Sequence, residues 1–376
     1  MALFNAHSVK NPEKRTEIAT FLTEFDVEVL FPTETWLGMR GDEAKCTDLT
    51  PPGYCMKSFP HSSRGGGLGV IFKDYLSSRI CFTTSFPFDH SSFELAQVSL
   101  TLLQHNTHLF CLYHPPPSSK NKITDSLFLD QFSDLLDRCN FLRGSLIILG
   151  DFNVHYDCPQ NSTTARAMDL PFHFNLTQSV SQATHEKGHI LDWLVHRSDD
   201  SIVRSTSVTS AIASDHLCVI SHLHVTVPRP PPSFVMARNI RAIDRTALKD
   251  DLLDCLSGLQ SLSAMDLDSH QRCVLDKHAP ATRRKFPSRR SAPWLKAVSE
   301  KIRADKQQRR RAERQWLKTG LTIHKQIYNR AKKCVTRLVH VAKTSYFCSM
   351  IRDSLSCKQL FRITNQLLGS LSLIHI

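Results

Sequence analysis

One stretch constrains the fold of this chain more than any other: the apolar run Leu146 to Leu149, followed by Gly-Asp-Phe-Asn at 150–153. A short apolar run that ends at a glycine indicates a buried strand. Side chains on an extended backbone alternate between two faces, so Asp151 and Asn153 are predicted to point into the same small volume. A carboxylate and a carboxamide at the open end of a buried strand can hold an anionic group or a hard cation. This arrangement is typical of an active site.

The first 227 residues alternate between strand patterns and polar loops. Apolar residues at helical spacing predict helices at 14–25 and 128–139. Apolar runs and alternating patterns predict strands at 27–31, 68–72, 98–102, 108–113, 146–149, 190–195 and 217–225. Many strands, few helices and polar residues at strand ends predict an α/β fold of two packed sheets flanked by helices, with the chemistry on the connecting loops.

A proline-rich tract at 228–232 marks the end of this first domain. Its composition predicts a stiff, extended linker over 228–237, which places the first domain at 1–227. Beyond the linker the strand patterns end. Apolar residues at helical spacing predict one helix from Leu295 to a break at Gly320 and a second one through Tyr346. We therefore expect a helical region at 238–369, and the tail 370–376 matches no pattern.

The net charge of +12 is distributed unevenly. Residues 283–362 contain 23 Lys and Arg against four Asp and Glu, a net charge of +19, so the rest of the chain carries −7. A basic region of this density favours a polyanionic partner, and nucleic acid is the commonest one inside cells. The alternative is that these residues form the solvated faces of helices.

Several classes of site are excluded by the sequence. The twelve cysteines form no Cys-x-x-Cys pair, which argues against a zinc ribbon and a thioredoxin-like site. The glycines at 65–67 lack the Lys-Ser/Thr ending of a P-loop. Neither a signal peptide nor a long apolar segment is present, so we expect a reducing intracellular location, with the nucleus among the compartments that fit, and no membrane partner.

Polar side chains recur where the predicted strands begin or end. Each of them alone has an ordinary structural explanation, such as a solvated acid or a polar turn. Their recurrence in one domain indicates a shared site. The residues are Asn5, Glu34, Tyr113, Asp151, Asn153, Asp192, Asp215 and His216.

These residues lie within short motifs that occur in a fixed order over about residues 4–225. The motifs are Asn-Ala-His-Ser-Val at 5–9, Thr-Glu-Thr-Trp-Leu at 33–37, Tyr-His-Pro-Pro at 113–116, Leu-Gly-Asp-Phe-Asn at 149–153, Ile-Leu-Asp-Trp at 190–193 and Ser-Asp-His at 214–216. With them the chain resembles the endonuclease/exonuclease/phosphatase superfamily, which includes DNase I-like nucleases. More narrowly, it resembles the endonuclease domain of a non-LTR (LINE-type) retrotransposon.

The basic region at 238–369, with Pro293 and Trp294, is similar to the segment that such elements place between nuclease and reverse transcriptase. No Tyr-x-Asp-Asp polymerase motif occurs in the chain. We therefore expect an element truncated before its reverse transcriptase, without polymerase activity.

The resemblance implies a four-layer, DNase I-like α/β sandwich that cleaves a phosphodiester with the help of Mg²⁺, or Mn²⁺ in its place. It implies that Glu34 is the principal metal ligand, with Asn5 and Asp215 beside it. Elementary chemistry agrees, because an anionic phosphodiester repels its nucleophile and a cation held by hard carboxylates neutralises that charge.

The resemblance also implies the catalytic roles. His216 and Asp192 would form a hydrogen-bonded pair beside the attacking water, and Asp151 would assist the nucleophile or the leaving oxygen. Asn153 and Tyr113 would hold phosphate oxygens. A histidine changes its protonation state in the required pH range, and a carboxylate on its other nitrogen fixes the tautomer.

The leading hypothesis is a metal-dependent endonuclease that nicks one DNA strand and leaves a 3′-hydroxyl. DNA is then the substrate, and RNA is a second polyanion that residues 283–362 could bind. One alternative is a phosphoesterase of the same superfamily that acts on a small-molecule or lipid phosphate, against which the +19 region argues. Another is an inactive remnant that binds nucleic acid through its helices alone.

Overall fold

The computed structural model divides the chain into two compact units, Met1–Pro228 with Ser291–Ile376, and Arg229–Arg290. The structure describes residues 1–38, 42–61, 65–83, 85–102, 105–118, 121–209, 214–225, 234–239, 243–257, 272, 274, 276–280, 282–285, 299–354 and 356–368. The proline tract at 228–232, the residues 293–295 and the tail 370–376 lie outside these ranges.

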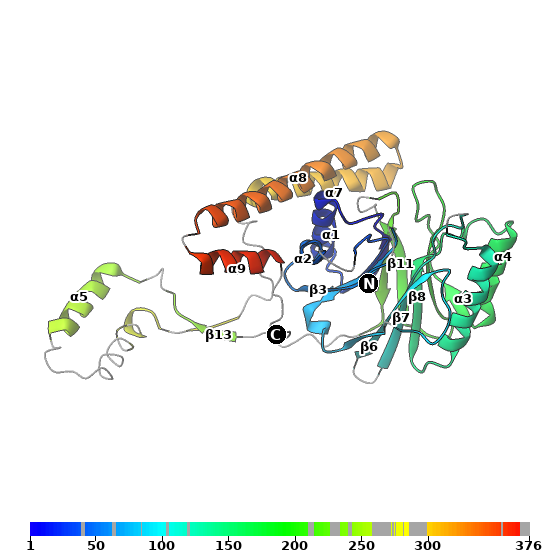
Figure 1. Ribbon diagram of the computed structural model, residues 1–376. Helices are drawn as coiled ribbons and strands as arrows, with labels where there is room; N and C mark the ends of the chain where they lie inside the picture. The colour runs from blue at the N-terminus through cyan, green and yellow to red at the C-terminus, as the bar shows by residue number, and fades with distance from the viewer. Residues whose placement is uncertain are drawn as a thin grey trace. The chain divides into compact units, whose positions relative to one another are not determined.

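Two six-stranded mixed sheets form the centre of the first unit (Figure 1). The first sheet has the order β11-β12-β1-β2-β4-β3, with strands Val203–Thr209, Cys218–Leu223, Ala2–Asn5, Val29–Thr33, Leu68–Lys73 and Tyr54–Phe59. The second has the order β5-β6-β7-β8-β10-β9, with strands Ile80–Thr83, Glu94–Leu102, His105–Tyr113, Ser145–Asp151, Asp192–Arg197 and Leu176–Gln178. The pairs β1–β2 and β7–β8 are parallel, and the other neighbours are antiparallel.

Helices cover the outer faces of both sheets (Figure 1). α1 (Pro12–Glu24) and α2 (Glu43–Leu49) pack on the first sheet, where Phe4, Ile18 and Leu22 belong to one buried cluster. α3 (Asp125–Asn140) and α4 (Ser162–His173) cover the second sheet, and a larger core fills the space between the sheets and beneath α3. A short 3₁₀ helix, Asp74–Leu76, joins β4 to β5. The four-layer sandwich expected from the sequence is confirmed.

Strand β8 contains the apolar run Leu146 to Leu149 and ends at Asp151. Leu146 to Leu149 are fully buried between the two neighbouring layers. A Cβ atom at Gly150 would lie only 1.8 Å from the backbone oxygen of Leu112, so only glycine permits this approach of β7 and β8. The strand therefore continues undistorted to its last residue, Asp151.

Three further helices belong to the same unit: α7 (Ser299–Thr319), α8 (Thr322–Arg352) and α9 (Cys357–Leu368). The predicted break at Gly320 is confirmed, and this residue has the left-handed φ of +65° that ends many helices. Ile302 of α7 packs against Val335 and Val339 of α8 in a small apolar core. Among the described residues, no helix is both long and apolar enough to cross a membrane.

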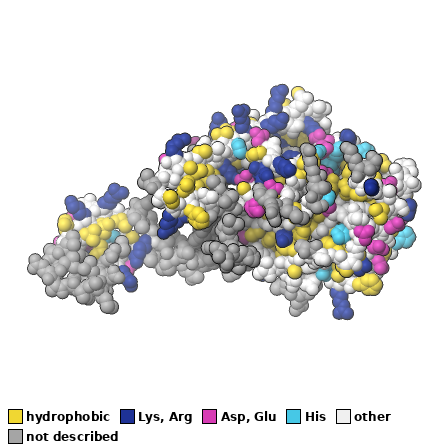
Figure 2. Space-filling view, viewed as in Figure 1, with side chains coloured by type: hydrophobic (Ala, Val, Ile, Leu, Met, Phe, Trp, Pro, Cys, Tyr) yellow, Lys and Arg dark blue, Asp and Glu magenta, His cyan; other side chains and the backbone are white. Residues whose placement is uncertain are grey.

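The basic helices dock on the sandwich through ion pairs with its acidic residues. Nitrogen–oxygen distances are 3.1 Å for Lys325–Glu186, 3.3 Å for Lys332–Glu17, 3.3 Å for Lys306–Glu24 and 2.5 Å for Lys343–Asp48. Other basic side chains on α7 and α8 are exposed to solvent, among them Arg310, Arg311, Arg314, Lys318, Arg330, Lys333 and Arg337. In Figure 2, Lys and Arg side chains lie along the upper edge of the view, where Figure 1 shows α7 and α8. The charge of the region thus divides into a docking set and a solvent-facing set.

The second unit contains the helix α5 (Arg245–Ser257) and a two-stranded antiparallel ladder, β13 (Phe234–Ala237) with β14 (Thr282–Lys285). β13 lies within the predicted linker at 228–237, and β14 lies within 238–369, where the expectation of helices alone was therefore wrong. β14 consists of Thr-Arg-Arg-Lys and has no apolar pattern that would predict a strand.

Candidate active site

Asp151 is the centre of the candidate site. It is fully buried at the end of β8. Strand β8 lies between β7 and β10, and in this register Asp151 stands beside Tyr113 on one neighbour and Asp192 on the other. Three predicted site residues are therefore brought together by strand pairing alone.

Asn5 links the two sheets at this point. It ends β1 in the first sheet, and its Nδ2 donates hydrogen bonds of 2.8 Å to Glu34 Oε1 and 2.8 Å to Asp151 Oδ2. The backbone N–H of His7 donates to Asn5 Oδ1 at 2.8 Å. Glu34 follows β2 with a left-handed φ of +48°, and Trp36 Nε1 donates to its second oxygen at 3.2 Å. Left-handed conformations at residues other than glycine are concentrated at functional sites.

His216 and Asp192 form the predicted pair. His216 Nδ1 lies 2.8 Å from Asp192 Oδ2, and its Nε2 lies 4.0 Å from Asp151 Oδ2. Burial alone would lower the pKa of His216, but the charge and hydrogen bond of Asp192, with Asp151 and Asp215 nearby, raise the pKa to about 9. Burial and the charge of Asp192 raise the pKa of the Asp151 carboxyl above its usual range.

Asp215 lies at the more exposed rim of the site. Its carboxylate is 3.3 Å from His185 Nε2 and 3.7 Å from His7 Nδ1. The neighbouring Ser214 donates a hydrogen bond of 2.8 Å from its Oγ to the backbone oxygen of Asn5, which ties the entry of β12 to β1. The structure therefore places Asp215 beside the Asn5 end of the site, although in direct contact with histidines.

The side chains of Asn153 and Asp151 lie in the same small volume, as predicted, but for a different reason. Its Nδ2 donates to Asp151 Oδ2 at 3.3 Å and to the backbone oxygen of His114 at 2.8 Å, and its backbone N–H donates to Asp151 Oδ1 at 3.0 Å. β8 ends at Asp151, and Asn153 has a φ of +49°. A turn therefore brings the two side chains together, and the expected alternation along a continuing strand was wrong.

One half-buried acid at the site, Glu94, does not stand out in the sequence. It begins β6 opposite Tyr113, and its Oε2 accepts a hydrogen bond of 2.7 Å from the backbone N–H of Gly67. Burial raises the pKa of Glu94 to about 7. Burial and the charge of Glu34, to which it is hydrogen bonded, raise the pKa of Tyr113. Only the register of the β6–β7 hairpin could have revealed Glu94, since an acid at the start of a strand is common.

The acidic cluster fits a hard divalent cation. Asp192 Oδ1 and Asp215 Oδ1 are buried and, among the described residues, have no hydrogen-bond partner. Burial, together with the charge of neighbouring carboxylates, raises the pKa of both Asp151 and Glu94, so a bound cation would stabilise their ionised forms. Glu34 and Asp215 offer carboxylate oxygens, which Mg²⁺ prefers, whereas the side-chain oxygen of Asn5 accepts a hydrogen bond from the backbone N–H of His7.

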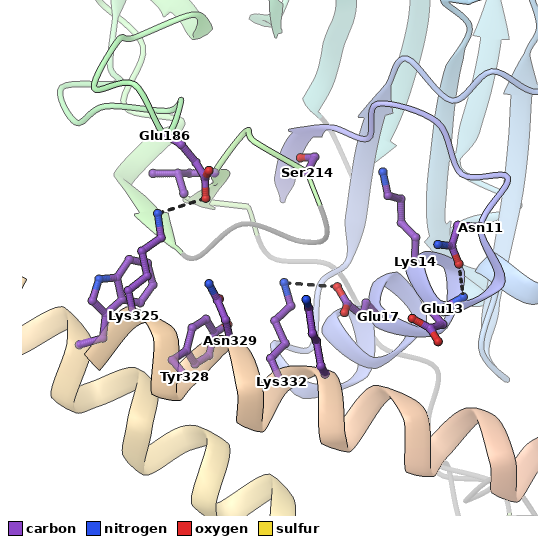
Figure 3. A pocket seen from close by; sticks show the side chains of 13 residues that line it. Asn11, Glu13, Lys14, Glu17, Glu186, Ser214, Lys325, Tyr328, Asn329 and Lys332 are labelled. Carbon is purple, nitrogen blue, oxygen red and sulfur yellow. Dashed lines mark hydrogen bonds and ion pairs between the residues drawn. The ribbon is translucent and has the colours of Figure 1, made fainter. Parts of the chain in front are cut away.

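A cavity of about 330 Å³ opens beside Ser214. Its walls come from α1, from α7 and α8, and from the loop that carries Glu186 (Figure 3). Lys325 reaches across to Glu186 and Lys332 to Glu17, as Figure 3 shows. The docked helices therefore reach the loop at Ser214, next to Asp215, but the cavity is lined by none of the predicted site residues.

A family model described as Endonuclease/Exonuclease/phosphatase family matches residues 2–216, more than half of the chain. The chain belongs to this family. Members of the endonuclease/exonuclease/phosphatase family are hydrolases that act on phosphodiester or phosphate bonds and generally depend on a divalent metal. No curated protein matches the chain.

Solved structures of the endonuclease/exonuclease/phosphatase fold are similar at low sequence identity. The AP endonuclease LMAP from Leishmania major is 15% identical, with a TM-score of 0.46, 58% of this chain covered and 86% of that one. The endonuclease domain of TRAS1, a telomere-specific non-LTR retrotransposon, is 12% identical, with a TM-score of 0.45 and coverage of 60% and 98%. A mannosyl-6-phosphatase from Bacteroides thetaiotaomicron is 11% identical, with a TM-score of 0.41 and coverage of 59% and 99%.

Replacing Glu34 with glutamine tests the predicted metal ligand. The glutamine oxygen can still accept from Asn5, but a negative charge is lost. We expect the Mg²⁺ concentration needed for half-maximal activity to rise by roughly 10- to 100-fold or more, because even outer partners of a metal ligand have effects of this size. Metal titration of the reaction measures it. Glu43→Gln, at an exposed acid of α2, is the control, and an unchanged requirement in Glu34→Gln would contradict the assignment.

Proposed function

We propose that this chain is a metal-dependent DNA endonuclease that nicks one strand and leaves a 3′-hydroxyl, as in target-site cleavage by a non-LTR retrotransposon. One observation carries the proposal: the buried Asp192–His216 pair faces Asp151, which Asn5 connects to Glu34. A base, a second carboxylate and a cluster of oxygen donors are thus within reach of one phosphate group.

In this proposal each residue has a separate role in cleavage. His216 Nε2, the ring nitrogen that Asp192 does not use, accepts the proton of the attacking water. Asp192 stabilises the charged ring that results. Asp151 orients the water or supplies a proton to the leaving oxygen, for which its raised pKa suits it. A bound divalent cation would neutralise the phosphate charge.

Tyr113 and Asn153 are proposed to bind phosphate oxygens. The O–H of Tyr113 donates to Glu34 in the structure and would turn to the substrate. Nδ2 of Asn153 makes a long, 3.3 Å hydrogen bond to Asp151 that it can exchange for one to a phosphate oxygen. Both groups lie next to Asp151, so they would act on the same phosphate.

DNA is favoured over a small substrate by the solvent-facing basic residues of α7 and α8. Arg330, Lys333 and Arg337 lie at helical spacing on one face of α8, and all three are exposed. α8 also lines the cavity beside Ser214. A row of solvent-facing cations on α8 would follow a nucleic-acid backbone, which a sugar phosphate or a lipid headgroup does not supply.

A substrate panel tests the proposal. Purified protein with Mg²⁺ is given duplex DNA, inositol phospholipids and sugar phosphates, and the ends of cleaved DNA are tested for extension by a DNA polymerase. We expect cleavage of DNA with extendable 3′ ends. Activity only on the lipids or sugar phosphates would support the phosphoesterase alternative, and binding of DNA without turnover would support an inactive remnant.

Removing the solvent-facing charges should weaken DNA binding and its dependence on salt. The triple variant Arg330→Gln, Lys333→Gln, Arg337→Gln is expected to lower the slope of log affinity against log salt by roughly 0.9 for each lost phosphate contact. DNA-binding isotherms over a series of salt concentrations measure this slope. Arg166→Gln, exposed on α4, is the control. A triple variant with the slope of the unmodified protein would show that this face does not bind DNA.

A further inference from the structure

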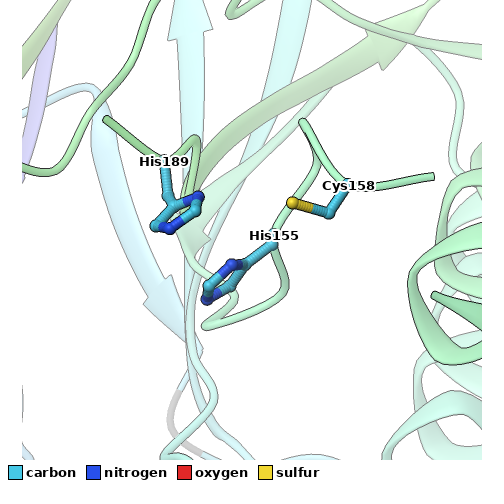
Figure 4. Close-up of side chains that lie close together, drawn as sticks. All are labelled: His155, Cys158 and His189. Atoms are coloured by element: carbon cyan, nitrogen blue, oxygen red, sulfur yellow. The ribbon is translucent and has the colours of Figure 1, made fainter. Parts of the chain in front are cut away.

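A second cluster of possible metal ligands lies outside the acidic site. His155 and Cys158 come from the loop after β8, and His189 comes from the loop before β10 (Figure 4). One ligand atom from each residue lies within 4.8 Å of the others, and the two imidazole ring centres are 4.1 Å apart. Figure 4 shows the three side chains directed toward one another.

Asp157 orients the ring of His189 in the way that carboxylates orient histidine ligands in known metal sites. Asp157 Oδ2 lies 2.9 Å from His189 Nδ1, which leaves Nε2 of that ring for an ion. The other oxygen of Asp157 accepts a hydrogen bond of 2.9 Å from the backbone N–H of Ile190. A carboxylate on the second nitrogen of a histidine fixes its tautomer and strengthens it as a ligand, and this partner is a regular feature of zinc sites.

The donor set selects the kind of ion. Two imidazoles and one thiol suit zinc and related transition ions, whereas Mg²⁺ requires oxygen ligands. Tetrahedral zinc, with bonds of about 2.0–2.3 Å, places its ligand atoms about 3.3–3.7 Å apart, so rotation of the side chains by about 1 Å would close the cluster. Ten cysteines whose side chains the structure describes are free, Cys158 among them, so it is available as a thiol.

We infer that His155, Cys158 and His189 form a binding site for Zn²⁺ or a similar transition ion, oriented by Asp157 and separate from the acidic site. Water would complete the coordination. The thiol of Cys158, which lies 3.5 Å from Asp157 Oδ2, would lose its proton to bulk water when the ion binds.

Such an ion would cross-link the loop after β8 and the loop before β10, and both loops also adjoin the acidic site. The backbone N–H of Tyr156 donates to the oxygen of Ile190 at 3.0 Å, so the loops are already in contact. The second loop carries Thr184, whose Oγ1 accepts a 3.0 Å hydrogen bond from the backbone N–H of Asp192. The bound ion would therefore stabilise the position of Asp192 without contacting the substrate.

Titration with Co²⁺ tests this inference, because a thiolate bound to cobalt gives a near-ultraviolet charge-transfer band. The full chain, reduced and free of metal, should develop this band at one Co²⁺ per chain and lose it when one equivalent of Zn²⁺ is added. Cys158→Ser should abolish the band. Asp157→Asn should weaken Co²⁺ binding by roughly 10- to 100-fold.

Two controls separate this site from others. Cys81→Ser removes an exposed thiol elsewhere and should leave the band unchanged. Glu34→Gln should also leave it unchanged, so the result does not depend on the proposed nuclease activity. His155→Gln, at an exposed residue, should also weaken Co²⁺ binding, and it serves as a second test if Cys158→Ser fails to fold. Absence of the band in the unmodified protein, or its persistence in Cys158→Ser, would overturn the inference.

Discussion

Replacement of Asp151 by asparagine is expected to lower the rate of DNA nicking by about 10²- to 10⁴-fold, the range that proton transfer by a positioned side chain contributes. Asparagine has nearly the same shape, and it can keep the hydrogen bond from Asn5 through its own oxygen. The change removes a fully buried carboxylate that lies 4.0 Å from His216. The loss should therefore fall on the chemical step and not on folding.

Single-turnover nicking of a supercoiled plasmid measures this effect, and thermal unfolding establishes whether the variant is folded. Asp137→Asn is the matched control, because Asp137 is an exposed acid on α3, on the outer face of the second sheet. A folded Asp151→Asn protein that nicks DNA at the rate of the control would rule out a catalytic role for Asp151.

The second large effect concerns pH. The pKa of His216 is raised to about 9, so near pH 7 only about 1% of the rings are neutral and able to accept a proton. If His216 is the base and Asp151 acts as the ionised carboxylate that orients the water, the rate should rise about tenfold for each pH unit from 7 toward 9. Asp192→Asn removes the charge that raises this pKa, so the midpoint of the rise should move to lower pH. The maximal rate should fall, because the amide no longer stabilises the charged ring.

Rates of nicking at a series of pH values, at saturating Mg²⁺, measure both profiles. Asp137→Asn again serves as the control and should follow the profile of the unmodified chain. A midpoint that stays in place in Asp192→Asn would show that the observed ionisation belongs to another group. A rate that falls between pH 7 and pH 9 would show that the protonated ring is the active form.

Much of the fold could be predicted because its signals are local. The apolar run at 146–149 is a strand buried on both faces, and such runs need no knowledge of their neighbours. The break at Gly320 follows equally from one residue. By contrast, β14 is Thr-Arg-Arg-Lys without an apolar pattern, and it is a strand because it pairs with β13, which a local pattern cannot reveal.

The same distinction applies to the site. Asp151, Asp192 and His216 could be named because each lies in a short motif at a strand end. Their contacts depend on register and on the packing of two sheets, as the bridge from Asn5 to Asp151 across 146 residues shows. Glu94 was missed for this reason, since only its place opposite Tyr113 brings it into the site.

The central claim is that residues from Glu34 to His216 form one metal-dependent site for cleaving a phosphodiester. Conversion of supercoiled plasmid to the nicked circle tests it most directly, measured with Mg²⁺, with a chelator, and after Mg²⁺ is restored. We predict nicking with Mg²⁺, none with the chelator, and full recovery on restoration. Equal nicking in the presence of the chelator, or no nicking by folded protein in Mg²⁺ or Mn²⁺, would contradict the claim.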